Sequence, residues 1–173
     1  MTTQPEEEEI RQWHKRFAVE ANNRAWDLAE QSGLTADEKI ELFHTAHASA
    51  YHWSQIGTPQ QIAQAELLLG HAHATLGNGE VAMEFATSAW DTITSGESAP
   101  WEVAFARAIL AGAAAAASNP DLHREHWAMT WKIRKTRKSS SLRSGEFRSL
   151  KPPSNVEDWT FVLEEFKIKG VLA

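Results

Sequence analysis

Four side chains between residues 35 and 56 are of the types that bind metal ions. Glu41 and His44 are three positions apart, so they share a face of the helix predicted there, and His47 and His52 follow on it. Di-iron bundle proteins use this Glu-x-x-His spacing in pairs, together with two further glutamates from facing helices. The chain has one such motif. A metal site built from these four residues is therefore an alternative to histidines that satisfy buried hydrogen bonds or face solvent.

Other residues with catalytic potential form no recognised motif. His71 and His73 are two positions apart and point to different helical faces, and no His-Glu-x-x-His zinc motif occurs. The chain also lacks a Walker-type loop, a Rossmann-type glycine fingerprint and a Gly-x-Ser-x-Gly elbow. It has no cysteine, which excludes a thiol nucleophile. The sequence predicts a protein that is not an enzyme and that uses no cofactor.

The composition indicates one globular domain. A chain of 173 residues with 42% hydrophobic residues can bury a substantial core. The N-terminus lacks the basic start and apolar stretch of a secretory signal. The most apolar segment, residues 109–117, is much shorter than the about 20 residues that a membrane-spanning helix needs. We expect a soluble protein in the cytoplasm, a compartment that the absence of cysteine permits.

Basic residues are concentrated near the C-terminus. The formal net charge of the chain is −6, which disfavours nucleic-acid binding by the whole surface. Residues 132–151 nevertheless contain eight Lys and Arg and one acid, Glu146. This stretch could attract nucleic acid, an anionic membrane surface or an acidic partner, but its serines and lack of aromatic residues before Phe147 are typical of a mobile linker. We predict a basic, Ser-rich linker over residues 137–154.

Six segments have the periodicity and end signals of helices. Thr35 with Glu38 and Thr58 with Gln61 have the spacing of capping boxes. No segment alternates with a period of two and β-branched enrichment, so no strand is predicted. The predicted helices cover residues 10–31, 35–56, 59–76, 80–93, 100–117 and a segment that starts near residue 120 and fades in the basic stretch.

These helices predict an all-α fold, a stack of about three antiparallel hairpins. Three positions recur at an offset of 36 residues, which favours a repeated hairpin over an irregular bundle. They are Ala46, Ala50 and Trp53, which recur as Ala82, Ala86 and Ala89.

Residues 63–94 resemble one tetratricopeptide repeat. Five positions match its pattern: Leu69, Gly70, Gly77, Ala82 and Ala89. Four positions depart from it: Glu66, His73, Ala86 and Thr94. The resemblance implies a right-handed stack that binds a protein or peptide in a concave groove lined by the first helix of each hairpin.

Candidate binding residues follow from the resemblance and from the first helix. If the groove is present, Leu67 and His71 are candidates to face it. The first helix carries a second apolar stripe that includes Trp26, with Asn22 and Asn23 beside it, and this stripe could bind a partner. Alternatively, it packs, because a helix inside a stack touches two neighbours and needs two apolar stripes.

The chain therefore divides into four predicted segments. An acidic, disordered N-terminus (1–9) precedes the tetratricopeptide-like domain (10–136), the linker (137–154) and an amphipathic helix (155–173). That helix could cap the stack, or dock on a second copy or another protein.

The function predicted from these segments is that of a non-catalytic scaffold for a protein or peptide partner of unknown identity. A homodimer is left open, and no membrane partner is expected. The alternative is a helical-bundle metal-binding protein or enzyme that uses Glu41, His44, His47 and His52.

Overall fold

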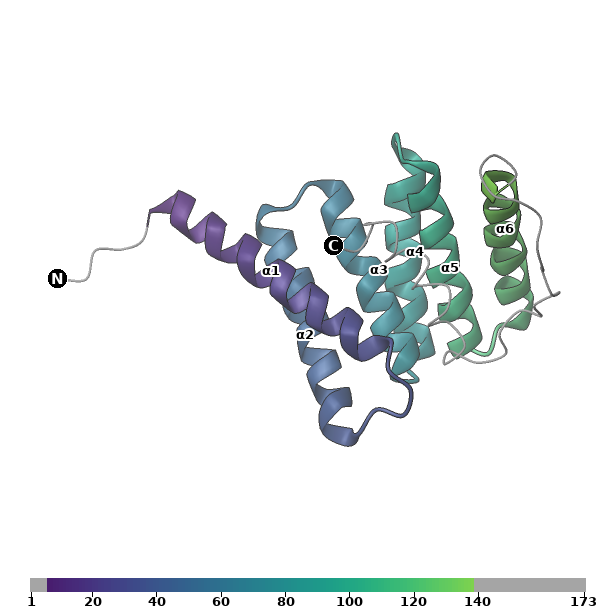
Figure 1. Ribbon diagram of the computed structural model, residues 1–173, viewed down its shortest axis with the longest axis horizontal. Coiled ribbons are helices and arrows are strands. Elements are labelled where there is room, and N and C mark those ends of the chain that lie inside the picture. Colours follow the sequence, from purple (N-terminus) through teal and green to yellow (C-terminus); the bar gives the residue numbers. More distant parts are fainter. Residues whose placement is uncertain (1–5, 139–173) are drawn as a thin grey trace.

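The computed structural model describes residues 6–138, and this part of the chain contains six helices and no strand. Each odd-numbered helix pairs with the next as a hairpin, and the hairpins pack side by side (Figure 1). The predicted all-α stack of three hairpins is confirmed for these residues. The helices are α1 (Glu7–Ala29), α2 (Ala36–Ile56), α3 (Pro59–Thr75), α4 (Gly79–Ser95), α5 (Pro100–Ala116) and α6 (Pro120–Lys138).

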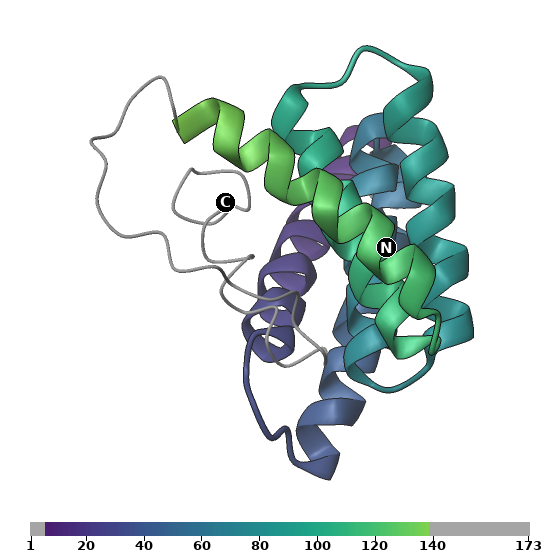
Figure 2. The same ribbon diagram turned by 90° about the vertical axis from the view of Figure 1, so that its right-hand side faces the viewer.

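Two kinds of helix contact join consecutive hairpins in the described part of the chain. The second helix of each hairpin contacts the first helix of the next, α2 with α3 and α4 with α5. The first helices also touch in order, α1 with α3 and α3 with α5. Figure 2 views the stack from its α6 end, with α6 in front of the other helices.

Two helix starts follow the capping boxes read from the sequence. At α2, the Thr35 backbone N–H donates to the Glu38 carboxylate at 2.8 Å, and the Glu38 N–H donates to the Thr35 hydroxyl at 3.3 Å. At α3, the Thr58 and Gln61 pair makes the equivalent bonds at 3.0 and 3.3 Å. These bonds satisfy backbone donors that have no partner within the helix.

Gly77 ends α3 through its left-handed backbone. Its φ is +80°, a conformation that glycine adopts at little cost. The Asn78 N–H then donates to the His73 carbonyl at 2.8 Å, and the Gly77 N–H donates to the Ala74 carbonyl at 3.1 Å. The reversal leads directly into α4.

The boundaries of the helical domain differ slightly from the prediction. α1 begins at Glu7 rather than at Ile10, so part of the predicted disordered N-terminus is helical. Acidic residues in a first turn stabilise a helix by interacting with its dipole, which accounts for the earlier start. α6 continues to Lys138, two residues beyond the predicted domain end. Residues 1–5, the remainder of the predicted linker and the predicted helix 155–173 lie outside the described residues.

Small residues let α4 approach both of its neighbours closely. A Cβ added at Gly70 of α3 would lie 3.2 Å from the Ala86 Cβ and from the Ala82 carbonyl oxygen. A Cβ added at Gly79 would lie 2.4 Å from backbone atoms of Ala116 at the end of α5. The backbone cannot yield as a flexible side chain does. Gly79 therefore fixes how closely α4 and α5 meet.

A buried carboxylate joins α3 to α5. Glu102 accepts hydrogen bonds from the side chains of Gln60 at 2.7 Å and Gln64 at 3.2 Å. Its other oxygen accepts from the Ala99 backbone N–H at 2.8 Å. The Glu102 carboxylate thus caps the start of α5 and also links α3 to α5 through hydrogen bonds.

No helix within residues 6–138 has both the length and the apolar character needed to cross a membrane.

We predict that Gly79→Ala destabilises the stack by about 1–3 kcal/mol, because its methyl group would overlap the α5 backbone. Urea denaturation followed by circular dichroism measures the change. Gly96→Ala is the matched control, because a Cβ there meets nothing within 4 Å. The control should shift the unfolding free energy by less than about 0.5 kcal/mol. Equal effects of the two substitutions would contradict the close approach of α4 and α5.

Candidate interaction surface

The four residues of the predicted metal cluster make separate contacts. The Arg24 guanidinium donates two hydrogen bonds to the Glu41 carboxylate, at 2.6 and 2.8 Å, and this pairing lowers the Glu41 pKa. His47 lies against His73, and the remaining members of the cluster lie elsewhere on α2. Within the described residues, no three or more His, Asp or Glu side chains are grouped so that they could hold a metal ion. The structure does not bring the four together.

His47 and His73 form a pair between two phenylalanine rings. Their Nε2 atoms are 3.1 Å apart, so one ring donates its N–H to the lone pair of the other. Phe43 lies 4.5 Å from His47, and Phe85 stacks on His73 with ring centroids 5.7 Å apart. Burial lowers the pKa of both histidines, and a neighbouring histidine lowers each further, His44 for His47 and His47 for His73. The pair is a hydrogen-bonded packing contact between α2 and α3.

Three of the predicted binding residues lie in the core. Trp26 of α1 stacks on His71 of α3, with ring centroids 5.3 Å apart, and lies 5.7 Å from Phe105 of α5. Trp26, Leu67 and His71 are all buried, with exposed fractions of 3%, 1% and 4%. Trp26 and His71 form the contact between α1 and α3, and Leu67 belongs to the buried core. Trp26, on the second apolar stripe of α1, therefore packs against neighbouring helices.

The two asparagines lie beside this contact. Asn22 is half-buried and Asn23 is exposed. The Asn22 side-chain amide donates to the Asn23 side-chain oxygen at 3.4 Å.

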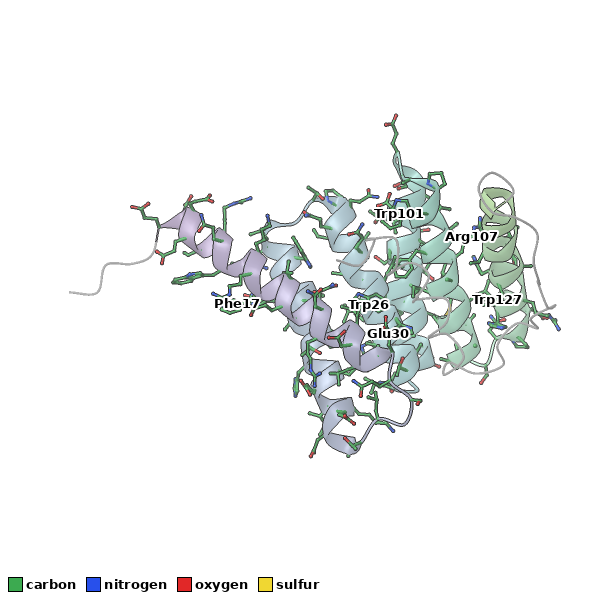
Figure 3. The ribbon with its side chains drawn as sticks, in the orientation of Figure 1. Phe17, Trp26, Glu30, Trp101, Arg107 and Trp127 are labelled. Carbon is green, nitrogen blue, oxygen red and sulfur yellow. The ribbon has the colours of Figure 1, made fainter. Side chains whose placement is uncertain are left out.

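An aromatic surface on the first hairpin was not singled out from the sequence. Ile10, Trp13 and Phe17 follow one another at helical spacing on the outer half of α1, with exposed fractions of 38%, 46% and 47%. The first turns of α1 extend beyond the other helices (Figure 1), and Figure 3 shows Phe17 nearer the start of α1 and Trp26 further along it, next to α3. The helical spacing of these residues is present in the sequence, but the sequence does not show which residues the other helices leave uncovered.

α2 extends this surface. Tyr51 is 59% exposed, and its neighbour His52 lies 5.5 Å from the Phe17 ring. The Nδ1 atoms of His52 and His14 are 2.9 Å apart, which joins the two helices. We call the whole set the aromatic patch. It consists of Ile10, Trp13, His14, Phe17, Tyr51 and His52.

The aromatic patch combines apolar and hydrogen-bonding side chains. Its side chains supply apolar area, aromatic rings and a few hydrogen-bonding atoms, the composition found at the centres of protein interfaces. Comparison of the chain with protein-family models, curated proteins and solved structures finds no match.

His71 generates a prediction about pH. Burial lowers its pKa to about 4, and its Nε2 has no hydrogen-bond partner in the described part of the chain. In the unfolded chain His71 takes up a proton near pH 6.5, whereas in the folded chain it does so only near pH 4. Protonation of His71 therefore favours the unfolded state, so the free energy of unfolding falls as the pH is lowered from 6.5 towards 4. The loss should amount to about 3 kcal/mol.

We expect His71→Phe, which keeps a ring beside Trp26, to lack this acid-sensitive contribution. In urea denaturation at several pH values, the free energy of unfolding should fall less for the variant than for the wild type as the pH is lowered. Replacement of an exposed histidine, His44→Gln, controls for loss of a histidine elsewhere. Parallel pH profiles for His71→Phe and the wild type would contradict the buried, neutral state of His71.

Proposed function

We propose that this chain is a non-catalytic, tetratricopeptide-like protein-binding module, and that the aromatic patch is its docking surface. One observation carries the proposal: Trp13, Phe17 and Tyr51 each leave about half or more of their surface in solvent, on two adjacent helices. A cytoplasmic location, which the absence of cysteine permits, belongs to the same proposal.

The grouping of these residues supports a binding role. Single exposed apolar residues are ordinary, whereas a contiguous patch on a soluble domain marks a site that another molecule covers. Tryptophan and tyrosine supply much of the binding energy at protein interfaces. The patch joins two rings of these types to Phe17 and Ile10, with polar groups at its edge.

The repeat resemblance supports a scaffold role for the rest of the stack. The first helices contact one another in order, and Gly70 lies against Ala82, both of which match the repeat pattern. Here the rings of Trp26 and His71 fill the contact between α1 and α3. The partner surface is therefore proposed on the outer hairpin rather than at these residues.

Site-specific photo-crosslinking tests the docking surface even while the partner is unidentified. We expect a photoreactive phenylalanine analogue at Phe17 to form covalent products with protein in the producing cells. Adding Trp13→Ala should reduce their yield, because the apolar contact loses its largest side chain. Mass spectrometry of the products identifies the protein that is captured.

Val19 provides the matched control. It is 38% exposed and follows Phe17 by two positions, so it lies on the opposite side of α1. The analogue at Val19 should give few products. Equal yields at Val19 and Phe17, or none at Phe17, would contradict the proposed role of the patch.

A further inference from the structure

We infer that the occupant of the aromatic patch is a second copy of this chain, bound through antiparallel pairing of the two α1 helices. The inference rests on the proposed function, because it names the partner of the same surface. It is carried by the distribution of charge along the outer half of α1.

This half of α1 is acidic at its start and basic further on. Residues 6–9 are four consecutive glutamates, and Arg11, Lys15 and Arg16 follow within the next two turns. Two parallel copies would place like charges opposite each other. Two antiparallel copies place the glutamates of each copy against the basic segment of the other, so the charges favour one orientation.

The register follows from the apolar stripe. Glu9 precedes Ile10 by one position and Arg16 precedes Phe17 by one position, so both charges flank the stripe on the same side. A two-fold axis perpendicular to α1 and midway between Glu9 and Arg16 brings each Glu9 beside Arg16 of the other copy. Trp13 lies next to this axis, so the two indoles meet at the centre of the interface.

The Glu9 and Arg16 side chains are both free enough in solvent to pair with the other copy. Glu9 is exposed, and the Arg16 side chain is 73% exposed although it also pairs with Glu20 at 2.9 Å. An ion pair this exposed contributes little, so Arg16 loses little by turning to a new partner. The start of α1 extends beyond the other described helices (Figure 1), whereas further along α1 His14 and Phe17 contact His52 of α2.

The surface area that the two copies can bury sets the expected affinity of the dimer. A fully buried aromatic side chain covers roughly 150–250 Å². Because about half of Trp13, Phe17 and Tyr51 is already covered, the three add roughly 200–400 Å² per copy. A standard interface buries about 800 Å² per partner. The dimer should therefore be reversible, with dissociation in the micromolar range or weaker.

Charge reversal tests the register directly. Sedimentation velocity of the full chain, from micromolar to hundreds of micromolar, should show the wild type passing from monomer to dimer. Glu9→Arg places two arginines together at each contact, and Arg16→Glu places two glutamates together. Each variant alone should dissociate at least about tenfold more readily.

Two combinations should restore the dimer. An equal mixture of the Glu9→Arg chain and the Arg16→Glu chain regains opposite charges at both contacts, so it should form a heterodimer. The double variant E9R/R16E should form a homodimer again. Glu84→Arg, the same charge change at an exposed position of α4, should leave the wild-type behaviour intact. Circular dichroism verifies that every variant is folded.

The contradicting outcomes separate this inference from the proposed function. A wild type that stays monomeric at every concentration overturns the inference, as does a dimer that ignores both charge reversals or is not restored by mixing. If crosslinking at Phe17 then captures a different protein, the proposed function survives and the second copy is excluded. If the chain stays monomeric and Phe17 captures nothing, both fail.

Discussion

Close approach of helices at small residues is the constraint on which the stack depends. The missing side chain at Gly79 allows α4 to touch the backbone at the end of α5, and the one at Gly70 allows α3 to lie against α4. A larger residue at Gly79 would separate the second hairpin from the third, and one at Gly70 would separate the two helices of the second hairpin. With α3 held between its neighbours, the rings of Trp26, His71 and Phe105 meet as one contact across three first helices.

The first hairpin differs because the stack covers only part of α1. α1 has 23 residues and α3 has 17, a difference of about 9 Å in length. The inner half of α1 therefore buries Ala25 and Leu28 against its neighbours, while Trp13 and Phe17 on the outer half stay partly in solvent. A stack of hairpins thus leaves an aromatic surface at its first helix, and α2 enlarges it with Tyr51.

The sequence predicted what is set locally. The capping boxes at Thr35 and Thr58 and the glycine at residue 77 act within a few residues, so the helix ends could be read directly. The positions of the candidate site residues depend on contacts between helices, so they could not be predicted from such local patterns. Leu67 and His71 were expected at an open groove, yet they are buried, because the apolar pattern of a helix does not reveal which of its faces meets a neighbour. The spacing of Glu41 and His44 likewise did not reveal that Arg24, on another helix, would pair with the carboxylate. The unequal lengths of α1 and α3 were present in the sequence, and they are the signal from which the uncovered half of α1 could have been inferred.

The division of α1 into a solvent-facing outer half and a buried inner half is best tested by hydroxyl-radical footprinting of the dilute chain, with mass spectrometry of each modified residue. We expect Trp13, Phe17 and Tyr51 to be oxidised rapidly, and Trp26 to be oxidised much more slowly after correction for intrinsic reactivity. Protection of Trp13 and Phe17 equal to that of Trp26 would show that the outer half of α1 is covered within the monomer, and would contradict the surface on which both proposals rest.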